Sequence, residues 1–178
     1  IRSIPTLQSL HSKAEIVIIG DAIGKGYGPT PEAGTWKDRF MQEIKGSYDP
    51  TKVHFVGCMD RSNYLKILQS SWVHVYLTIP FVVSWSLLEA MSCSCSVVGS
   101  STAPVQEIIQ HNKNGLLTDF FDPNSLAQTV CSLLEDRSLA QRLGHAARAT
   151  IEEKYSLKTC LPRQLALIEL VANGVLGH

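Results

Sequence analysis

Near its middle the chain reads Ser84-Trp85-Ser86-Leu87-Leu88-Glu89-Ala90-Met91, a few residues after the apolar run Val73-His74-Val75-Tyr76-Leu77. A short apolar, β-branched run followed by a run of helix-forming residues predicts a strand, a loop and a helix. Ser84 or Ser86 is the expected cap, because a serine hydroxyl accepts a hydrogen bond from backbone amides of the first helical turn. The segment therefore predicts one β-α unit.

The same unit repeats along the chain. Four more strands are expected at Ala14–Gly20, Lys52–Gly57, Ser96–Gly99 and Gly115–Thr118. Helical patterns lie between the strands and after the last one, at Trp36–Ile44, Tyr64–Gln69, Leu87–Met91, Val105–Ile109, Leu126–Leu134, Leu139–Tyr155 and Leu161–Val171. Strands that alternate with helices of this length require right-handed crossovers. We therefore predict an α/β fold: a doubly wound, Rossmann-like parallel sheet with C-terminal helices.

The length of 178 residues predicts a single domain. The chain begins with Ile1 rather than Met, and its opening residues form a helical pattern with no strand before it. A doubly wound domain normally begins with a strand. We therefore expect an N-terminally truncated fragment that lacks the first strand of its domain.

Composition excludes several classes of partner and cofactor. Sixteen Lys and Arg balance sixteen Asp and Glu, so no overall field draws the chain to nucleic acid. No apolar run reaches the ~20 residues that span a bilayer. The five cysteines are an odd number and are dispersed, and the histidines form no cluster with metal-ligand spacing. We therefore expect a cytoplasmic protein that needs no metal and no other cofactor.

Ligands of doubly wound sheets bind outside the carboxyl ends of the strands. This rule selects the loops 20–28, 57–60, 78–85 and 99–104. In the third loop the capped helix start is a ready anion site, and Glu89, one turn further, can accept hydrogen bonds from ribose hydroxyls. Many crossover helices also begin with Ser and carry a solvated Glu, so these residues alone leave both interpretations open.

The residues that follow carry a more specific signal. After Leu87-Leu88-Glu89-Ala90-Met91 the chain continues with Ser96-Val97-Val98-Gly99, Pro104-Val105-Gln106-Glu107-Ile108-Ile109, Asn114-Gly115-Leu116-Leu117 and Asp122-Pro123. The order of these motifs resembles the donor-binding core of the group 1 (family 4) glycosyltransferases, over about residues 15–155. The resemblance implies the C-terminal half of a GT-B enzyme with two Rossmann-like domains. Such an enzyme transfers a sugar, with retention, from a nucleoside diphosphate sugar to a glycan, lipid or small-molecule acceptor.

The resemblance also implies residue roles. Glu89 would hold the donor ribose, and backbone amides at Ser84 and Trp85 would meet the phosphates. The strand end at Gly57 would approach the nucleobase, and Lys25 would neutralise the leaving diphosphate as the candidate catalytic residue. An ordinary strand-to-helix turn and a surface lysine are the alternatives for the last two. The full candidate donor site is Gly20, Asp21, Gly57, Cys58, Met59, Ser84, Trp85, Ser86, Leu88 and Glu89.

One position departs from the family pattern. Phe81 stands where the family has the first of two glutamates separated by seven residues, and Val82-Val83-Ser84-Trp85 replaces Gly-Phe-Gly-Leu. A phenyl ring cannot contact a sugar or phosphate as a carboxylate does. This leaves two interpretations: a sub-branch with an altered loop, or a nucleotide-binding module without transferase activity. A dinucleotide oxidoreductase is remote, because the Gly-x-Gly-x-x-Gly fingerprint is absent.

In the resembling enzymes the N-terminal domain supplies the acceptor site. Because we expect that domain to be missing here, the fragment alone should be inactive. A C-terminal helix within residues 156–178 would pack back on that domain, and any peripheral membrane contact would be made through it.

Overall fold

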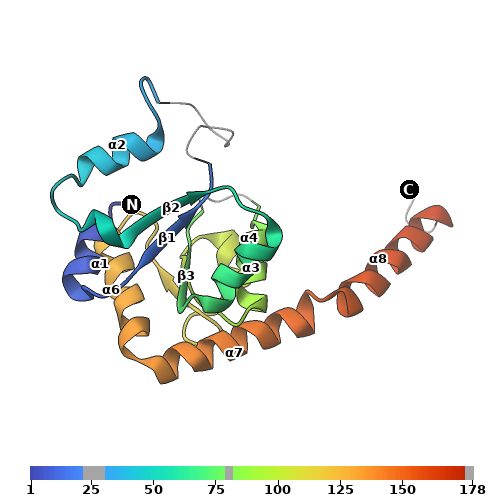
Figure 1. Cartoon of the computed structure of the whole chain (residues 1–178). Helices are drawn as coiled ribbons and strands as arrows, with labels where there is room; N and C mark the ends of the chain where they lie inside the picture. The colour runs from blue at the N-terminus through green and yellow to red at the C-terminus, as the bar shows by residue number, and fades with distance from the viewer. Residues whose placement is uncertain (22–30, 79–81, 175–178) are drawn as a thin grey trace.

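The structure, a computed structural model, describes residues 1–21, 31–78 and 82–174 (Figure 1). Its strands are β1 (Ile16–Ile19), β2 (Val53–Gly57), β3 (Val73–Tyr76), β4 (Ser96–Ser100) and β5 (Leu116–Thr118). Every strand pair is parallel, as predicted. The strands are hydrogen-bonded in two sets, β1-β2 and β3-β4-β5, rather than in the one continuous ladder that the sequence suggested.

The helices follow the predicted order. They are α1 (Ile4–Leu10), α2 (Trp36–Glu43), α3 (Arg61–Ser70), α4 (Trp85–Ser92), α5 (Ala103–Gln106), α6 (Pro123–Glu135), α7 (Arg137–Lys154) and α8 (Leu157–Ala172), with a short 3₁₀ helix η1 (Pro50–Lys52) before β2. Helix α5 is shorter than predicted. The side chain of Asn114 accepts a hydrogen bond from the Gln110 amide (2.7 Å) and donates one to the Ile108 carbonyl (3.0 Å), so these residues form a turn instead of helix.

Strand β4 lies at the centre of the core, and all five of its residues are buried. Val97 belongs to an apolar cluster with residues of α4, such as Leu87 and Met91. Its neighbour Val98 belongs to a second cluster with residues of α6 and α7, such as Leu133. Successive side chains of a strand point to opposite faces, so β4 is covered on both faces. This arrangement confirms the predicted α/β class.

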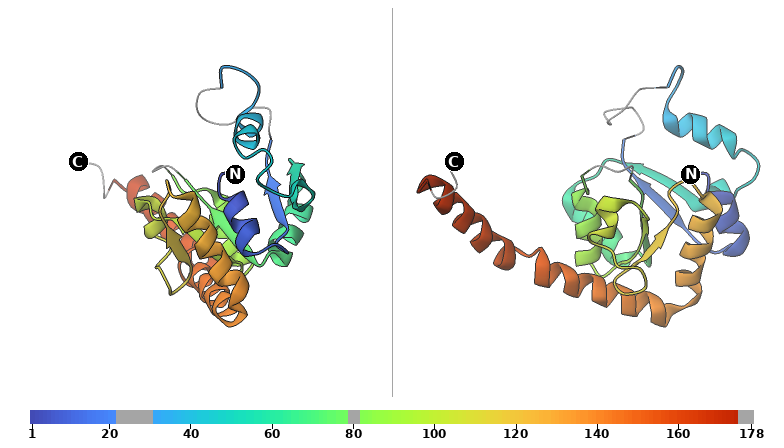
Figure 2. Two further views of the ribbon diagram at one scale, coloured as in Figure 1. Left: turned by 90° about the vertical axis from the view of Figure 1, so that its left-hand side faces the viewer. Right: turned by 180° about the vertical axis from the view of Figure 1, so that it is seen from behind.

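Helices α7 and α8 end the chain. Helix α7 packs along α4 and β4, whereas α8 runs away from the rest of the chain in Figure 1 and in the right-hand view of Figure 2. No residue of α8 is buried, and its exposed apolar side chains include Leu157, Leu161, Leu165 and Ile168. None of the helices in the described ranges is both long and apolar enough to span a membrane.

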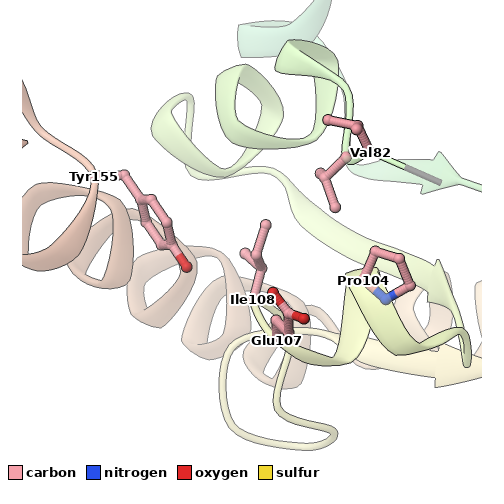
Figure 3. A pocket seen from close by; sticks show the side chains of 6 residues that line it. Val82, Pro104, Glu107, Ile108 and Tyr155 are labelled. Atoms are coloured by element: carbon pink, nitrogen blue, oxygen red, sulfur yellow. The ribbon is translucent and has the colours of Figure 1, made fainter. Parts of the chain in front are cut away.

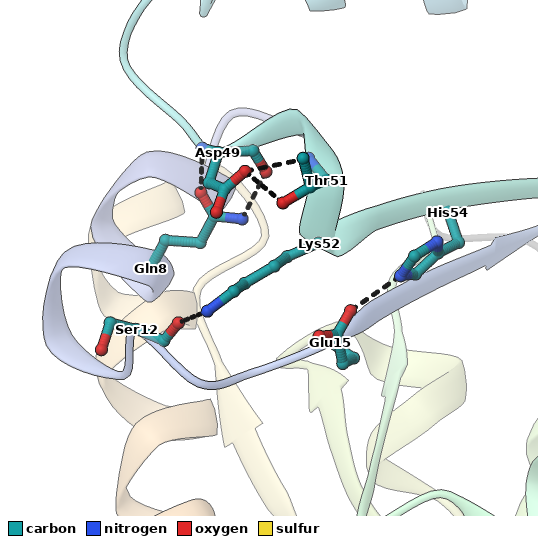
Figure 4. Close-up of polar contacts among 7 residues, drawn as sticks. All are labelled: Gln8, Ser12, Glu15, Asp49, Thr51, Lys52 and His54. Atoms are coloured by element: carbon teal, nitrogen blue, oxygen red, sulfur yellow. Dashed lines mark hydrogen bonds and ion pairs between the residues drawn. The ribbon is translucent and has the colours of Figure 1, made fainter.

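Polar contacts join α1 and β1 to η1 and β2 (Figure 4). The Gln8 amide group exchanges two hydrogen bonds with the backbone of Asp49, at 2.7 and 3.1 Å. Lys52 donates to the Ser12 carbonyl, and His54 Nε2 lies 2.7 Å from a carboxylate oxygen of Glu15. These contacts hold β1 beside β2 at their amino ends. Because the two strands are parallel, their carboxyl ends lie at the same edge of the sheet.

Candidate functional site

The ends of β1 and β2 are joined at two glycines. The Gly20 amide donates a 3.0 Å hydrogen bond to the Gly57 carbonyl, and a register shift between Ile18 and Ile19 pairs Ile19 with Gly57. Gly57 has a φ of +67°, a left-handed conformation that glycine adopts without steric cost. Two loops that the sequence selected separately, 20–28 and 57–60, therefore start side by side. Beyond Gly57, Cys58 is exposed and Met59 half-buried.

An ion pair joins the start of α3 to α4. Asp60 caps α3 by accepting a hydrogen bond from the Asn63 amide (3.0 Å). Arg61, the first residue of the helix, donates from Nη1 to Oε1 of Glu89. The Arg61 side chain is 72% exposed and that of Glu89 only 19%. Arg61 is not among the residues predicted for the site from sequence, although a cation directly after the strand-end loop 57–60 was a usable signal.

Tyr64 lies one turn further along α3. Its hydroxyl is buried and has no hydrogen-bond partner among the described residues. Burial raises the pKa of the Tyr64 hydroxyl above its usual value, and the negative charges of Glu89 and of the nearby cysteine thiols, if ionised, raise it further. Tyr64 is therefore neutral at physiological pH and lies close enough to Glu89 to sense its charge.

The start of α4 is held by the last residue of β3. Ser84 is the helix cap, and its hydroxyl accepts from the Ser86 amide at 3.2 Å. We expected the backbone amides of Ser84 and Trp85 to be free for phosphate. The Ser84 amide instead donates to the buried Tyr76 hydroxyl at 2.8 Å, which gives that hydroxyl a partner. The Trp85 amide has no acceptor within the described residues.

The side chains of this segment divide between solvent and core. The Trp85 indole is 81% exposed. Leu88 is half-buried and packs against the core cluster of β4, which suits a supporting role better than direct contact with a ligand.

The end of β4 is linked to the end of β3. The hydroxyl of Ser100 accepts from the Thr78 amide at 3.2 Å and lies 3.3 Å from the Thr78 carbonyl. It also lies 3.1 Å from the hydroxyl of Thr102, the cap residue of α5. The loops after β3 and β4 therefore begin side by side, as the rule for parallel sheets predicts.

A shallow pocket of about 540 Å³ opens beside these loops (Figure 3). It is lined by Val82, Val83, Pro104, Glu107, Ile108 and Tyr155. Glu107 is the one charged residue among the described residues of this lining, although the sequence placed it in the predicted helix Val105–Ile109 and not in the candidate site. Tyr155 comes from the end of α7, far away in sequence, so no local pattern marked it.

Two predicted residues cannot be placed. Lys25, the candidate catalytic residue, and Phe81, the departure from the family pattern, lie outside the described residues. Asp21 directly follows Gly20 and is exposed. Within residues 1–21, 31–78 and 82–174, no group of three or more His, Cys, Asp or Glu is arranged to hold a metal ion.

Comparison with known proteins identifies the family. Residues 1–150 match the family model described as glycosyl transferases group 1, and the chain belongs to this family. N-acetyl-alpha-D-glucosaminyl L-malate synthase of Bacillus anthracis is 28% identical over 142 residues, which cover 80% of this chain and 34% of that protein. Poly(ribitol-phosphate) alpha-N-acetylglucosaminyltransferase of Staphylococcus aureus is 27% identical, covering 93% of this chain and 34% of that protein.

Solved structures agree in fold. The crystal structure of Anabaena Alr3699/HepE in complex with UDP superposes with a TM-score of 0.80 at 18% identity, covering 94% of this chain and 44% of that one. The chain spans about a third of the length of the relatives that it matches in sequence. The fold and family are those of the domain that the sequence resembled.

Proposed function

We propose that this chain binds a nucleoside diphosphate sugar and serves a retaining hexosyl transfer to a glycan, lipid or small-molecule acceptor. The observation that carries the proposal is the meeting of the strand ends at one edge. The Gly20–Gly57 hydrogen bond joins the ends of β1 and β2, and the Arg61–Glu89 ion pair joins this region to α4. A nucleotide bound along this edge of the sheet would contact the backbone at Gly57, the start of α4 and the carboxylate of Glu89.

Each part of the nucleotide has a proposed partner. The half-buried Gly57, with the exposed Cys58 and the half-buried Met59, takes the nucleobase. The Trp85 amide, which has no acceptor among the described residues, lies at the positive end of α4 and takes a phosphate oxygen. Glu89 accepts hydrogen bonds from the ribose, and Lys25 neutralises the leaving diphosphate. No metal is required in this scheme, because backbone amides and a lysine provide the positive potential.

In our proposal, sugar transfer requires a second domain in addition to this chain. The aligned stretch makes up 34% of each of two relatives, and we propose that a second domain supplies the acceptor site. The exposed apolar side chains of α8, including Leu161 and Leu165, are suited to pack on such a domain. We further propose that the enzyme works in the cytoplasm and that any peripheral membrane contact is made through the second domain. By itself, this chain would bind the donor without transferring the sugar.

Calorimetric titration tests the binding step. We expect a Kd for UDP, GDP or ADP well below that for NAD, and the same Kd in the presence of EDTA. Ligand at a hundred times its Kd should also raise the free energy of unfolding by about 2.7 kcal/mol. Failure of all three nucleoside diphosphates to bind, or loss of binding in EDTA, would contradict the proposal.

A second candidate function is nucleotide binding without transfer. Phe81, in place of the first family glutamate, favours it. Incubation of nucleotide sugars with the chain and with the complete protein, at several acceptors, separates the two functions by product analysis. Release of nucleoside diphosphate with a new α-linked product supports the transferase. Tight donor binding with neither transfer nor donor hydrolysis supports the binding module.

A further inference from the structure

We propose that Arg61 is a positioning residue that orients the Glu89 carboxylate toward the ribose of the bound nucleotide. The inference rests on the proposed donor site and adds a residue to it. Arg61 would act through Glu89, without itself touching the substrate.

The geometry gives each oxygen of Glu89 a different environment. Oε1 accepts a hydrogen bond from Nη1 of Arg61, whereas Oε2 accepts none from the described residues. A carboxylate has lone pairs for several donors, so Oε2 remains available to ribose hydroxyls. The pair is anchored on two helices, α3 and α4, which pack on each other.

The backbone is held in place at both residues of the ion pair. Asp60 caps α3 immediately before Arg61, through the Asn63 amide and the Asn63 side chain (2.7 Å). Glu89 is followed by the fully buried residues Ala90 and Met91. Tyr64 packs on the same core cluster and lies close enough to Glu89 for the carboxylate charge to raise the pKa of its hydroxyl. Glu89 is therefore confined on the core side by packing and on the solvent side by Arg61.

The ion pair is suited to orientation more than to stability. Exposed ion pairs contribute little to folding, and Arg61 is mostly in solvent. A glutamate without a partner moves among several rotamers, and fixing it costs conformational entropy when a ligand binds. Arg61 fixes Glu89 before the nucleotide arrives, which is preorganisation of the site.

A cycle of protein variants and nucleotides tests this role. Calorimetry would give the Kd of UDP, GDP and ADP, each beside its 2′-deoxy and 3′-deoxy analogue, for the wild type, Arg61→Ala, Arg61→Lys and Glu89→Ala. The control is Lys66→Ala, which removes a positive charge from the exposed face of the same helix. Urea denaturation of each variant confirms that it is folded.

We expect the wild type to prefer the ribonucleotide over its deoxy analogue by roughly tenfold, since hydrogen bonds to a charged acceptor are strong. Arg61→Ala should reduce this preference to about threefold or less, Arg61→Lys to an intermediate value, and Glu89→Ala should abolish it. Lys66→Ala should leave it unchanged. The Arg61→Ala, Glu89→Ala double variant should match Glu89→Ala alone.

Other outcomes overturn the inference in distinguishable ways. Equal weakening of ribonucleotide and deoxynucleotide by Arg61→Ala would mean that the guanidinium contacts the diphosphate directly. An unchanged affinity for both nucleotides in Arg61→Ala, with an unchanged preference, would deny any role for Arg61, while donor binding would stand. A wild type that binds none of UDP, GDP and ADP would remove the proposed function and this inference together.

Discussion

The backbone amide of Ser84 donates a 2.8 Å hydrogen bond to the hydroxyl of Tyr76. The donor is the cap residue of α4, and the acceptor is the last residue of β3. This bond brings the chain back to the strand end after the loop and fixes where α4 begins. The amide of Trp85, which we propose for phosphate contact, is the next one along the chain.

Tyr76→Phe should therefore affect stability and ligand binding together. The Ser84 amide would lose its acceptor in a half-buried place, at a cost of about 1–2 kcal/mol in the free energy of unfolding. The affinity for a nucleoside diphosphate should fall by a few-fold, because α4 is less firmly held. Urea denaturation and calorimetry measure the two effects.

The matched control is Tyr48→Phe. The Tyr48 ring is half-buried, and its hydroxyl has no hydrogen bond within the described residues, so this change should cost little. Equal stability of the Tyr76 and Tyr48 variants would show that the bond to Ser84 does not hold the loop.

Much of the fold could be predicted because it is encoded locally. The β-branched runs around Ile18 and Val97 form strands as expected, and the Ser84 cap was one of two candidates at the correct helix start. The sequence also identified the strand-end loops, because parallel strands share one edge. The split of the strands into two hydrogen-bonded sets was not predicted, since it depends on how whole β-α units pack.

The details of the site depend on contacts between distant residues. The Arg61–Glu89 ion pair joins positions 28 residues apart, and the Tyr76 hydroxyl reaches Ser84 across the loop. Tyr155 reaches the pocket from the far end of α7. No periodicity or motif in the sequence marks such pairs, because each depends on the packing of two elements. The family resemblance suggested roles for Glu89 and Lys25 but gave no information on these partners.

Gly144→Ala should destabilise the protein although the residue lies inside helix α7. In an ordinary helix interior a change from glycine to alanine raises the free energy of unfolding by about 1 kcal/mol, because alanine is the better helix former. Here an added Cβ would lie 2.2 Å from the backbone carbonyl oxygen of Ser94. Backbone cannot move aside as a side chain can, so we expect a net loss of about 1–3 kcal/mol. Urea denaturation measures it.

The exposed residue Ala149, on the same helix, provides the comparison. Ala149→Gly should lower the free energy of unfolding by about 1 kcal/mol, because glycine is the poorer helix former and no contact is changed. If Gly144→Ala were as stable as the wild type or more so, α7 would not be in close contact with Ser94.

His74 in β3 should make stability depend on pH. Burial lowers the pKa of His74 from 6.5 to about 4. The unfolded chain therefore takes up a proton between these values while the folded protein does not. The free energy of unfolding therefore does not depend on His74 above pH 6.5. As the pH falls from 6.5 toward 4, proton uptake by His74 in the unfolded chain lowers the free energy of unfolding by up to about 3 kcal/mol.

Urea denaturation at several pH values between 7 and 4 checks this, with His74→Val as the reference. Because the carboxylates titrate equally in both proteins, the difference between wild type and variant isolates His74. We expect the wild type to lose stability relative to the variant as the pH falls. Parallel curves for the two proteins would contradict a half-buried His74 that stays neutral in the folded protein.

The pKa of Tyr64 should report the charges around the candidate ribose site. Burial is the first cause of its raised pKa and the Glu89 charge the second, while Arg61 lowers it. Glu89→Gln should therefore lower the pKa of Tyr64 without returning it to the ordinary value near 10. Arg61→Ala should shift it in the opposite direction, and Lys66→Ala should leave it unchanged.

Tyrosinate absorbance titrations, each paired with the same protein carrying Tyr64→Phe, isolate the curve of this residue. Circular dichroism at each pH confirms that the protein remains folded. Opposite shifts in the Glu89 and Arg61 variants would show that both charges lie beside Tyr64 in solution and that the ion pair holds there without any ligand. If neither variant moved the pKa, the carboxylate would lie elsewhere in solution, and a site that depends on its fixed position could not form.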